Sequence, residues 1–164
     1  MTHTNEHRIR SVVLSIMCCL PFGTAAHQQP SSIEREHRLD GQFKLVSKTA
    51  GIPANVKDAF AKITRQPSFA MANPGEKFQA TDFVIDRTLP WRRLVFAGAQ
   101  DGKWFVHYER GGRGHSYYVT TFKLSPHTDA NFEWGCSVVG VAKTLEELRT
   151  MVAACRLAKA DSYW

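Results

Sequence analysis

Apolar and polar residues alternate with a period of two over much of residues 81–141, and this pattern limits the fold more than any other feature. Such alternation is typical of β-strands that bury one face. Asp101-Gly102 favours a tight hairpin, and the glycines of Gly111–Gly114 supply the positive φ angles of a second reversal. Consecutive hairpins predict an antiparallel meander. Its expected strands are Asp82–Asp86, Trp91–Gly98, Lys103–Arg110, His115–Leu124 and Phe132–Val141.

Two segments outside the meander have helical periodicity. In Asn55–Arg65 the apolar residues recur at helical spacing, and Asn55 is a candidate N-cap. A second helix is expected from Leu145 to about Ala158, because Thr144–Glu147 has the pattern of a capping box. Phe43–Ser47 is expected to form a short strand. We therefore predict an α+β fold, an antiparallel β-meander of four to five strands with one face packed on two helices.

The N-terminal segment predicts export. A short basic stretch precedes the apolar run Ser11–Leu20, which ends at Pro21 and is followed by small residues. A membrane anchor needs about 20 apolar residues, roughly twice what this run offers. We expect cleavage after Ala26, with Ala25 as the alternative, and no membrane span after cleavage.

Cleavage defines the expected organisation of the chain. Residues 1–26 are a signal peptide, residues 27–42 a polar leader, and residues 43–164 a single α+β domain. A domain of this length can bury a substantial core. The expected location is the periplasm or the outside of the cell.

Two cysteines remain in the expected mature chain, Cys136 and Cys155. In an oxidising compartment two cysteines most simply form one disulfide. Both lie on apolar faces, Cys136 on the last strand and Cys155 on the last helix, so we predict that these faces meet. A bridge that closes about 20 residues would add roughly 3 kcal/mol of stability.

Basic and aromatic residues concentrate in residues 87–123, while the whole chain has a formal net charge of +6. If Arg110 pairs with His115 and Ala99 with Trp104, each face of the meander can be assigned, although a one-residue slip would exchange the faces. One face is then expected to carry Val95, Ala97, Trp104, Val106, Tyr108, Tyr117 and Val119 and to pack on the helices. The other is expected to carry Arg92, Leu94, Phe96, Phe105, His107, Glu109, Tyr118 and Phe122.

The mixed second face is the expected working surface. Arginine beside exposed aromatic rings suits anionic or planar partners. The predicted protein is an exported, inhibitor-like binding module whose partner is an acidic envelope protein or an anionic glycan. Nucleic acid is not an expected partner, because export separates the protein from most of it and no RNP-like motif is present. The binding residues assigned to this surface are Arg92, Arg93, Phe105, His107, Arg113 and Tyr118.

Two other functions remain open from the sequence. A small periplasmic hydrolase or metal-binding protein could be centred on His107, Glu109 and His115. The predicted pairing places His115 on the opposite face from the other two, and two ligands are too few for a zinc site. A structural envelope protein without a discrete site is the second alternative. We assign no catalytic residue, no metal ligand and no cofactor.

Overall fold

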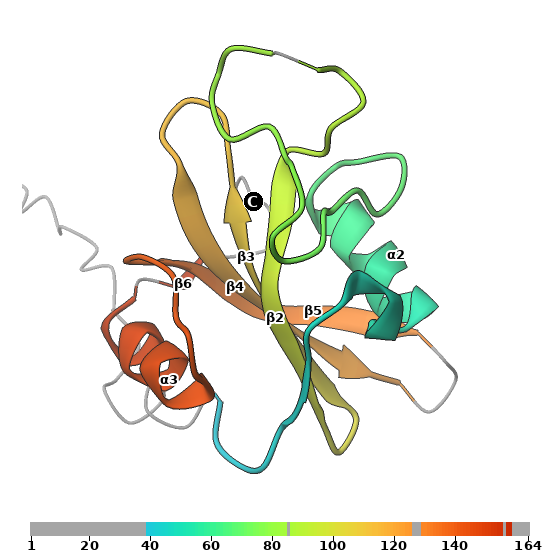
Figure 1. Cartoon of the computed structure of the whole chain (residues 1–164). Helices are drawn as coiled ribbons and strands as arrows, with labels where there is room; N and C mark the ends of the chain where they lie inside the picture. The colour runs from blue at the N-terminus through green and yellow to red at the C-terminus, as the bar shows by residue number, and fades with distance from the viewer. Residues whose placement is uncertain (1–38, 85, 126–128, 156, 159–164) are drawn as a thin grey trace, which may run out of the picture.

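The computed structural model describes residues 39–84, 86–125, 129–155 and 157–158, which form one antiparallel sheet with helices on both sides (Figure 1). The expected signal peptide and nearly all of the polar leader lie outside the described residues. The sheet has six strands in the sequential order β1 to β6. The strands are β1 (Lys44–Val46), β2 (Arg92–Gln100), β3 (Lys103–Arg110), β4 (Ser116–Leu124), β5 (Ala130–Val138) and β6 (Leu157–Ala158). The helices are the 3₁₀ turn η1 (Thr49–Gly51), α2 (Ala54–Ile63) and α3 (Leu145–Ala154).

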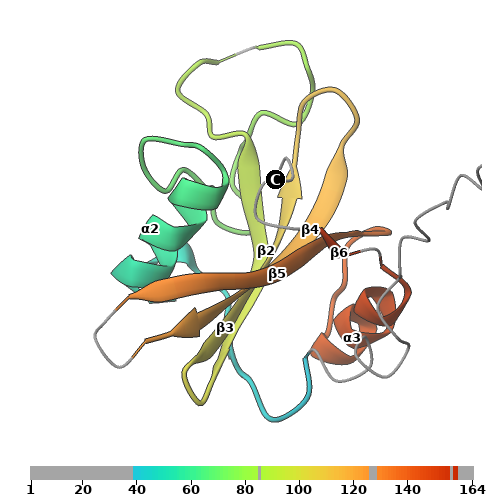
Figure 2. The ribbon, with the colours of Figure 1, turned by 180° about the vertical axis from the view of Figure 1, so that it is seen from behind.

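The predicted α+β fold is confirmed, but the two helices do not share one face of the sheet. Figures 1 and 2 show α2 and α3 on opposite sides of it. Two separate apolar cores match this arrangement. One core joins α2 to the sheet through Val56 and Phe60, and the other joins α3 through Leu148 and Val152. Both faces of the central strands are therefore buried, and no open working face remains over them.

The Asp101-Gly102 hairpin forms as predicted. Both residues have positive φ, 42° and 75°, and β2 pairs with β3 so that Ala99 faces Trp104. This is the geometry of a two-residue type I′ turn, whose twist matches that of the strands.

The register of the next hairpin corrects the predicted faces. Arg110 pairs with Ser116 rather than with His115, so the β3–β4 loop is one residue longer than predicted. Tyr118 therefore lies beside Tyr108, and Val119 lies beside His107. Because side chains alternate along a strand, this one-residue change exchanges the faces of every β4 residue.

A bulge in β2 causes the second error in the predicted assignment of side chains to the two faces. The register shifts between Leu94 and Phe96, so the first part of β2 presents its side chains to the face opposite from the one predicted. Arg92 and Leu94 consequently share the α2 face with Tyr108.

The segment Asp82–Asp86 is not a strand among its described residues. Local hydrogen bonds replace sheet pairing there. The Asp86 carboxylate accepts hydrogen bonds from the backbone N–H of Thr88 at 2.8 Å and from its hydroxyl at 2.6 Å. Such side-chain turns compete with extended structure, and Phe83 stays 75% exposed.

The C-terminal helix begins as predicted and ends earlier. The hydroxyl of Thr144 accepts the Glu147 N–H at 3.1 Å, while the Glu147 carboxylate accepts the Lys143 N–H at 2.6 Å. The helix ends at Ala154, and Cys155 has extended backbone angles. The chain then pairs briefly with β5 as β6.

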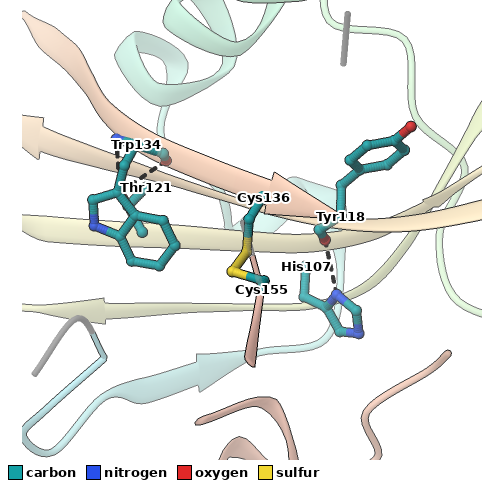
Figure 3. The surroundings of a disulfide bond; sticks show 6 residues. All are labelled: His107, Tyr118, Thr121, Trp134, Cys136 and Cys155. Atoms are coloured by element: carbon teal, nitrogen blue, oxygen red, sulfur yellow. Dashed lines mark hydrogen bonds between the residues drawn. A yellow bond between two sulfur atoms is a disulfide. The ribbon is translucent and has the colours of Figure 1, made fainter. Parts of the chain in front are cut away.

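The predicted disulfide between Cys136 and Cys155 is present, with the two Cα atoms 6.1 Å apart. It joins β5 to the end of α3 inside the second core (Figure 3). Cys136 is fully buried and Cys155 nearly so. The bond therefore holds α3 against its face of the sheet.

Candidate anion-binding pocket

A cavity of about 460 Å³ opens at the end of the sheet where β2 begins and β3 ends. In both overall views the loop before β2 and the β3–β4 turn rise at this same end (Figures 1 and 2). The cavity lies on the α2 side of the sheet, since Arg92, Arg110 and Tyr118 occupy that face. Its lining residues are Gln66, Asp82, Trp91, Arg92, Arg110, Gly111, Gly112, Arg113, Gly114, Ser116 and Tyr118.

The end of α2 delivers Gln66 to this cavity. Arg65 has a left-handed φ of 54°, and its N–H bonds to the Lys62 carbonyl at 3.2 Å. The Gln66 N–H bonds to the Ala61 carbonyl at 2.9 Å. These two bonds form a Schellman motif, which ends the helix sharply and turns the chain toward the cavity.

Backbone contacts join the two loops that form the other walls. The Gly111 N–H donates to the Trp91 carbonyl at 3.0 Å, and the Gln79 N–H donates to the Pro90 carbonyl at 2.9 Å. A side chain at Gly111 would overlap the Gln79 carbonyl oxygen. Only glycine therefore permits this close approach between the turn and the loop.

Three arginines dominate the charge of the cavity. Arg92 and Arg110 are direct cross-strand partners, an arrangement that is unfavourable for like charges. Arg113 lies exposed in the turn, and Asp82 is the one carboxylate among the lining residues. The cavity thus carries an excess of two positive charges.

Arg92 is the buried member of this group, with 4% of its surface exposed. Burial lowers the pKa of its guanidinium, and the nearby Tyr108 phenol opposes that effect. The guanidinium also lies 5.9 Å from the centre of the Phe60 ring. Burial raises the pKa of Tyr108 itself, so this phenol stays protonated.

Aromatic rings form part of the cavity wall. Trp91 is 37% exposed, and Gly112, whose φ of 102° favours glycine, lies in the turn next to its ring. Tyr118 stacks on Tyr108 with ring centres 5.5 Å apart. The cavity therefore combines fixed aromatic surfaces with hydrogen-bond donors.

A second hollow of about 300 Å³ adjoins the first. It shares Gln66, Trp91 and Arg92 with the larger cavity and adds Arg87. The two hollows therefore have wall residues in common, Trp91 among them.

The structure gathers three of the six predicted binding residues in this cavity: Arg92, Arg113 and Tyr118. Phe105 and His107 are fully buried in the core on the α3 side, so their placement on an exposed working face was wrong. Trp91 and Arg110 also line the cavity. They belong to the basic, aromatic stretch 87–123, but the sequence alone does not assign them to the binding surface. Asp82 and Gln66 carry no sequence signal, because loop packing brings them to the cavity.

Arg93 belongs to a separate charged cluster on the α3 side of the sheet. The buried Glu109 carboxylate pairs with the Arg93 Nε and accepts a hydrogen bond from His115 Nε2 at 2.8 Å. The Arg93 guanidinium also lies 4.4 Å from the centre of the Phe78 ring. The prediction that His115 and Glu109 lie on opposite faces is therefore wrong.

The hydrogen bonds of His107 are made to backbone groups outside this cluster. Its Nδ1 lies 2.8 Å from the Tyr118 carbonyl (Figure 3), and its Nε2 accepts the Ala142 N–H at 3.2 Å. These partners fix a neutral imidazole with the proton on Nδ1. Burial lowers the pKa of His107, which favours the same neutral form. Both ring nitrogens are thus engaged in holding the loop before α3.

Two further observations concern metal ligands and membrane-spanning helices. Over the residues that the structure describes, no three His, Cys, Asp or Glu side chains gather closely enough to hold a metal ion. Neither described helix has the length and apolar character of a membrane-spanning segment. Comparisons with protein families, with curated proteins and with solved structures gave no match.

Proposed function

We propose that this protein is an exported binding module that holds an anionic group of an envelope partner in the arginine cavity. The observation that carries the proposal is the convergence of Arg92, Arg110 and Arg113 on a cavity with one carboxylate. Guanidinium groups donate paired hydrogen bonds to planar oxyanions. An anion placed there would also relieve the repulsion between Arg92 and Arg110.

The chemistry of the lining favours binding over catalysis. Arginine remains protonated and exchanges no proton near neutral pH. No histidine or cysteine lines this cavity in the described part of the chain. The histidines nearest in sequence, His107 and His115, are engaged by backbone groups and by Glu109.

The disulfide supports the proposed location. Structural disulfides persist in secreted and periplasmic proteins and are rare in the cytosol. The bond between Cys136 and Cys155 therefore agrees with the export that the N-terminal sequence predicts.

The test measures binding of anionic polymers by the full chain. Poly-L-glutamate and polygalacturonate are titrated by calorimetry into the wild type and into an Arg110→Met/Arg113→Met variant, which keeps Arg92 and the core intact. The matched control is Lys103→Met/Lys123→Met, which loses the same charge. Lys103 and Lys123 are exposed cross-strand partners on β3 and β4, at the end of β3 opposite Arg110.

We expect at least one polymer to bind, and the arginine variant to bind it roughly tenfold more weakly or worse, since each charged hydrogen bond contributes about 1.5–3 kcal/mol. The lysine control should bind nearly as the wild type does. Raising the salt concentration to about 0.5 M should weaken binding, because exposed charges are then screened. Equal losses in the two variants would refute a discrete site, and the absence of binding to either polymer would refute the proposed function.

A further inference from the structure

We infer that the ligand of the cavity is a carboxylated saccharide, such as a uronic acid oligomer, rather than an acidic polypeptide. This inference rests on the proposed function and specifies its ligand class. The hydrogen-bond donors and acceptors that line the cavity indicate this ligand class. The arginines can only donate hydrogen bonds, whereas the Asp82 carboxylate oxygens accept them. A ligand that satisfies both must carry an anion and a donor close to it.

The charge of the cavity selects the kind of donor. An ammonium group would meet the Asp82 carboxylate but would also face three guanidinium groups. A hydroxyl or a peptide N–H donates to Asp82 without this repulsion, but an acidic residue of a polypeptide offers one such N–H whereas a sugar ring offers several hydroxyls. A uronic acid carries a carboxylate and several hydroxyls on one ring, so a single sugar unit meets both requirements.

Trp91 adds an aromatic surface to the cavity. It is partly exposed and lies in the cavity wall. The carbon–hydrogen face of a pyranose ring packs well on an indole, while the hydroxyls at the ring edge reach planar polar groups. Gln66 and Asp82 are two such groups in the same lining.

The neighbouring hollow extends the proposed ligand from one sugar to several. The two hollows share Trp91 and Arg92, and each adds its own cation, Arg87 in the smaller and Arg110 in the larger. Their volumes of about 460 and 300 Å³ each lie within the range of small-molecule sites. A repeated carboxylate along a chain of sugars would meet a repeated arginine along the site.

The experiment compares three probes on the full chain by calorimetry: trigalacturonic acid, its methyl ester, and triglutamate. The triglutamate is N-acetylated and C-amidated, so it carries the same three carboxylates as the acid and no ammonium, and only the sugar carries ring hydroxyls. The decisive variant is Asp82→Ala, because its two effects have opposite signs. Loss of a negative charge should strengthen the binding of any anion, whereas loss of the hydroxyl acceptor should weaken the binding of a sugar. Glu133→Ala, at an exposed position on β5, is the charge-matched control.

We expect trigalacturonic acid to bind about tenfold more tightly than triglutamate or the ester, a difference of about one well-formed charged hydrogen bond. Asp82→Ala should weaken the sugar acid severalfold and leave triglutamate unchanged or tighter, and Glu133→Ala should change neither. A Trp91→Leu variant, whose stability is checked by thermal denaturation, should also weaken the sugar acid more than triglutamate.

Two outcomes would overturn the inference in distinguishable ways. If triglutamate binds as tightly as trigalacturonic acid, and Asp82→Ala strengthens both, the site is a carboxylate site without sugar selectivity and the proposed function stands alone. If neither anion binds at the arginines, the proposed function fails and the inference fails with it.

Discussion

The disulfide gives the sharpest prediction of stability. Cys136 and Cys155 are 19 residues apart in sequence, so the bond closes a loop of about 20 residues that includes all of α3. In the chain-entropy account, a loop of this size removes about 11 cal/mol/K from the unfolded chain, or about 3 kcal/mol at 25 °C. Domains of this size unfold with only about 5–15 kcal/mol, so the bond is a large part of the total.

Two perturbations separate the crosslink from the sulfur atoms. Reduction of the wild type breaks the bond and leaves both buried sulfurs in place. A Cys136→Ala/Cys155→Ala variant also removes their packing in the α3 core, where Cys136 is fully buried. We expect reduction to cost about 3 kcal/mol and the double substitution to cost about 1 kcal/mol more, because a small cavity forms.

Urea and thermal unfolding, followed by circular dichroism, measure these losses. The expected decrease in Tm on reduction is roughly 10 °C for a domain of this length. The urea slope should rise on reduction, since an uncrosslinked unfolded chain exposes more surface. Reductant should not change the double variant, a control that excludes effects of Cys18 and Cys19. A loss below about 1 kcal/mol on reduction would refute the reasoning, because the chain-entropy contribution alone exceeds it.

Three other predictions follow from particular contacts. Burial lowers the pKa of His107 below its unfolded value, so its contribution to stability is complete above about pH 6.5 and is lost as the pH falls. Urea unfolding at several pH values should show that the free energy of unfolding of His107→Gln falls less steeply with decreasing pH than that of the wild type. An equally steep fall in the two proteins would contradict this. Thr144→Ala should cost about 1 kcal/mol, because the N-cap of α3 is lost, which the same urea assay measures. Gly111→Ala should cost about 1–3 kcal/mol and weaken anion binding, since the new Cβ overlaps the Gln79 carbonyl. Gly75→Ala strains a positive φ of 81° but its Cβ meets nothing within 4 Å, so it should lower stability and leave binding unchanged.

Much of the fold could be predicted because local signals were strong. Asp101-Gly102 has few alternatives to a tight hairpin, and β3 has the predicted bounds Lys103–Arg110. The capping box positions the start of α3, and the export expected from the N-terminal segment, together with two remaining cysteines, predicts the disulfide. The hairpin and the helix cap depend on neighbouring residues, and the disulfide has only one possible pairing between the two remaining cysteines.

The faces of the meander could not be predicted, because they depend on single-residue register. A four-residue and a five-residue loop after Arg110 fit the same glycines equally well, and the bulge between Leu94 and Phe96 leaves no composition signal. These two shifts moved Arg92 and Tyr118 to the α2 side and left His107 buried on the other. The positions of Gln66 and Asp82 in the cavity wall depend on the packing of the loops. The periodicity of the sequence gives no information about that packing.

The most direct measurement of the central claim is a ¹⁵N NMR titration of the full chain with trigalacturonic acid and, separately, with triglutamate. It reads the side-chain N–H groups of Arg92, Arg110 and Arg113 and the indole N–H of Trp91. Binding in the arginine cavity predicts saturable shifts at these groups with at least one of the two anions. Saturable shifts confined to other surfaces, or shifts that grow linearly without saturation, would contradict an anion site in this cavity.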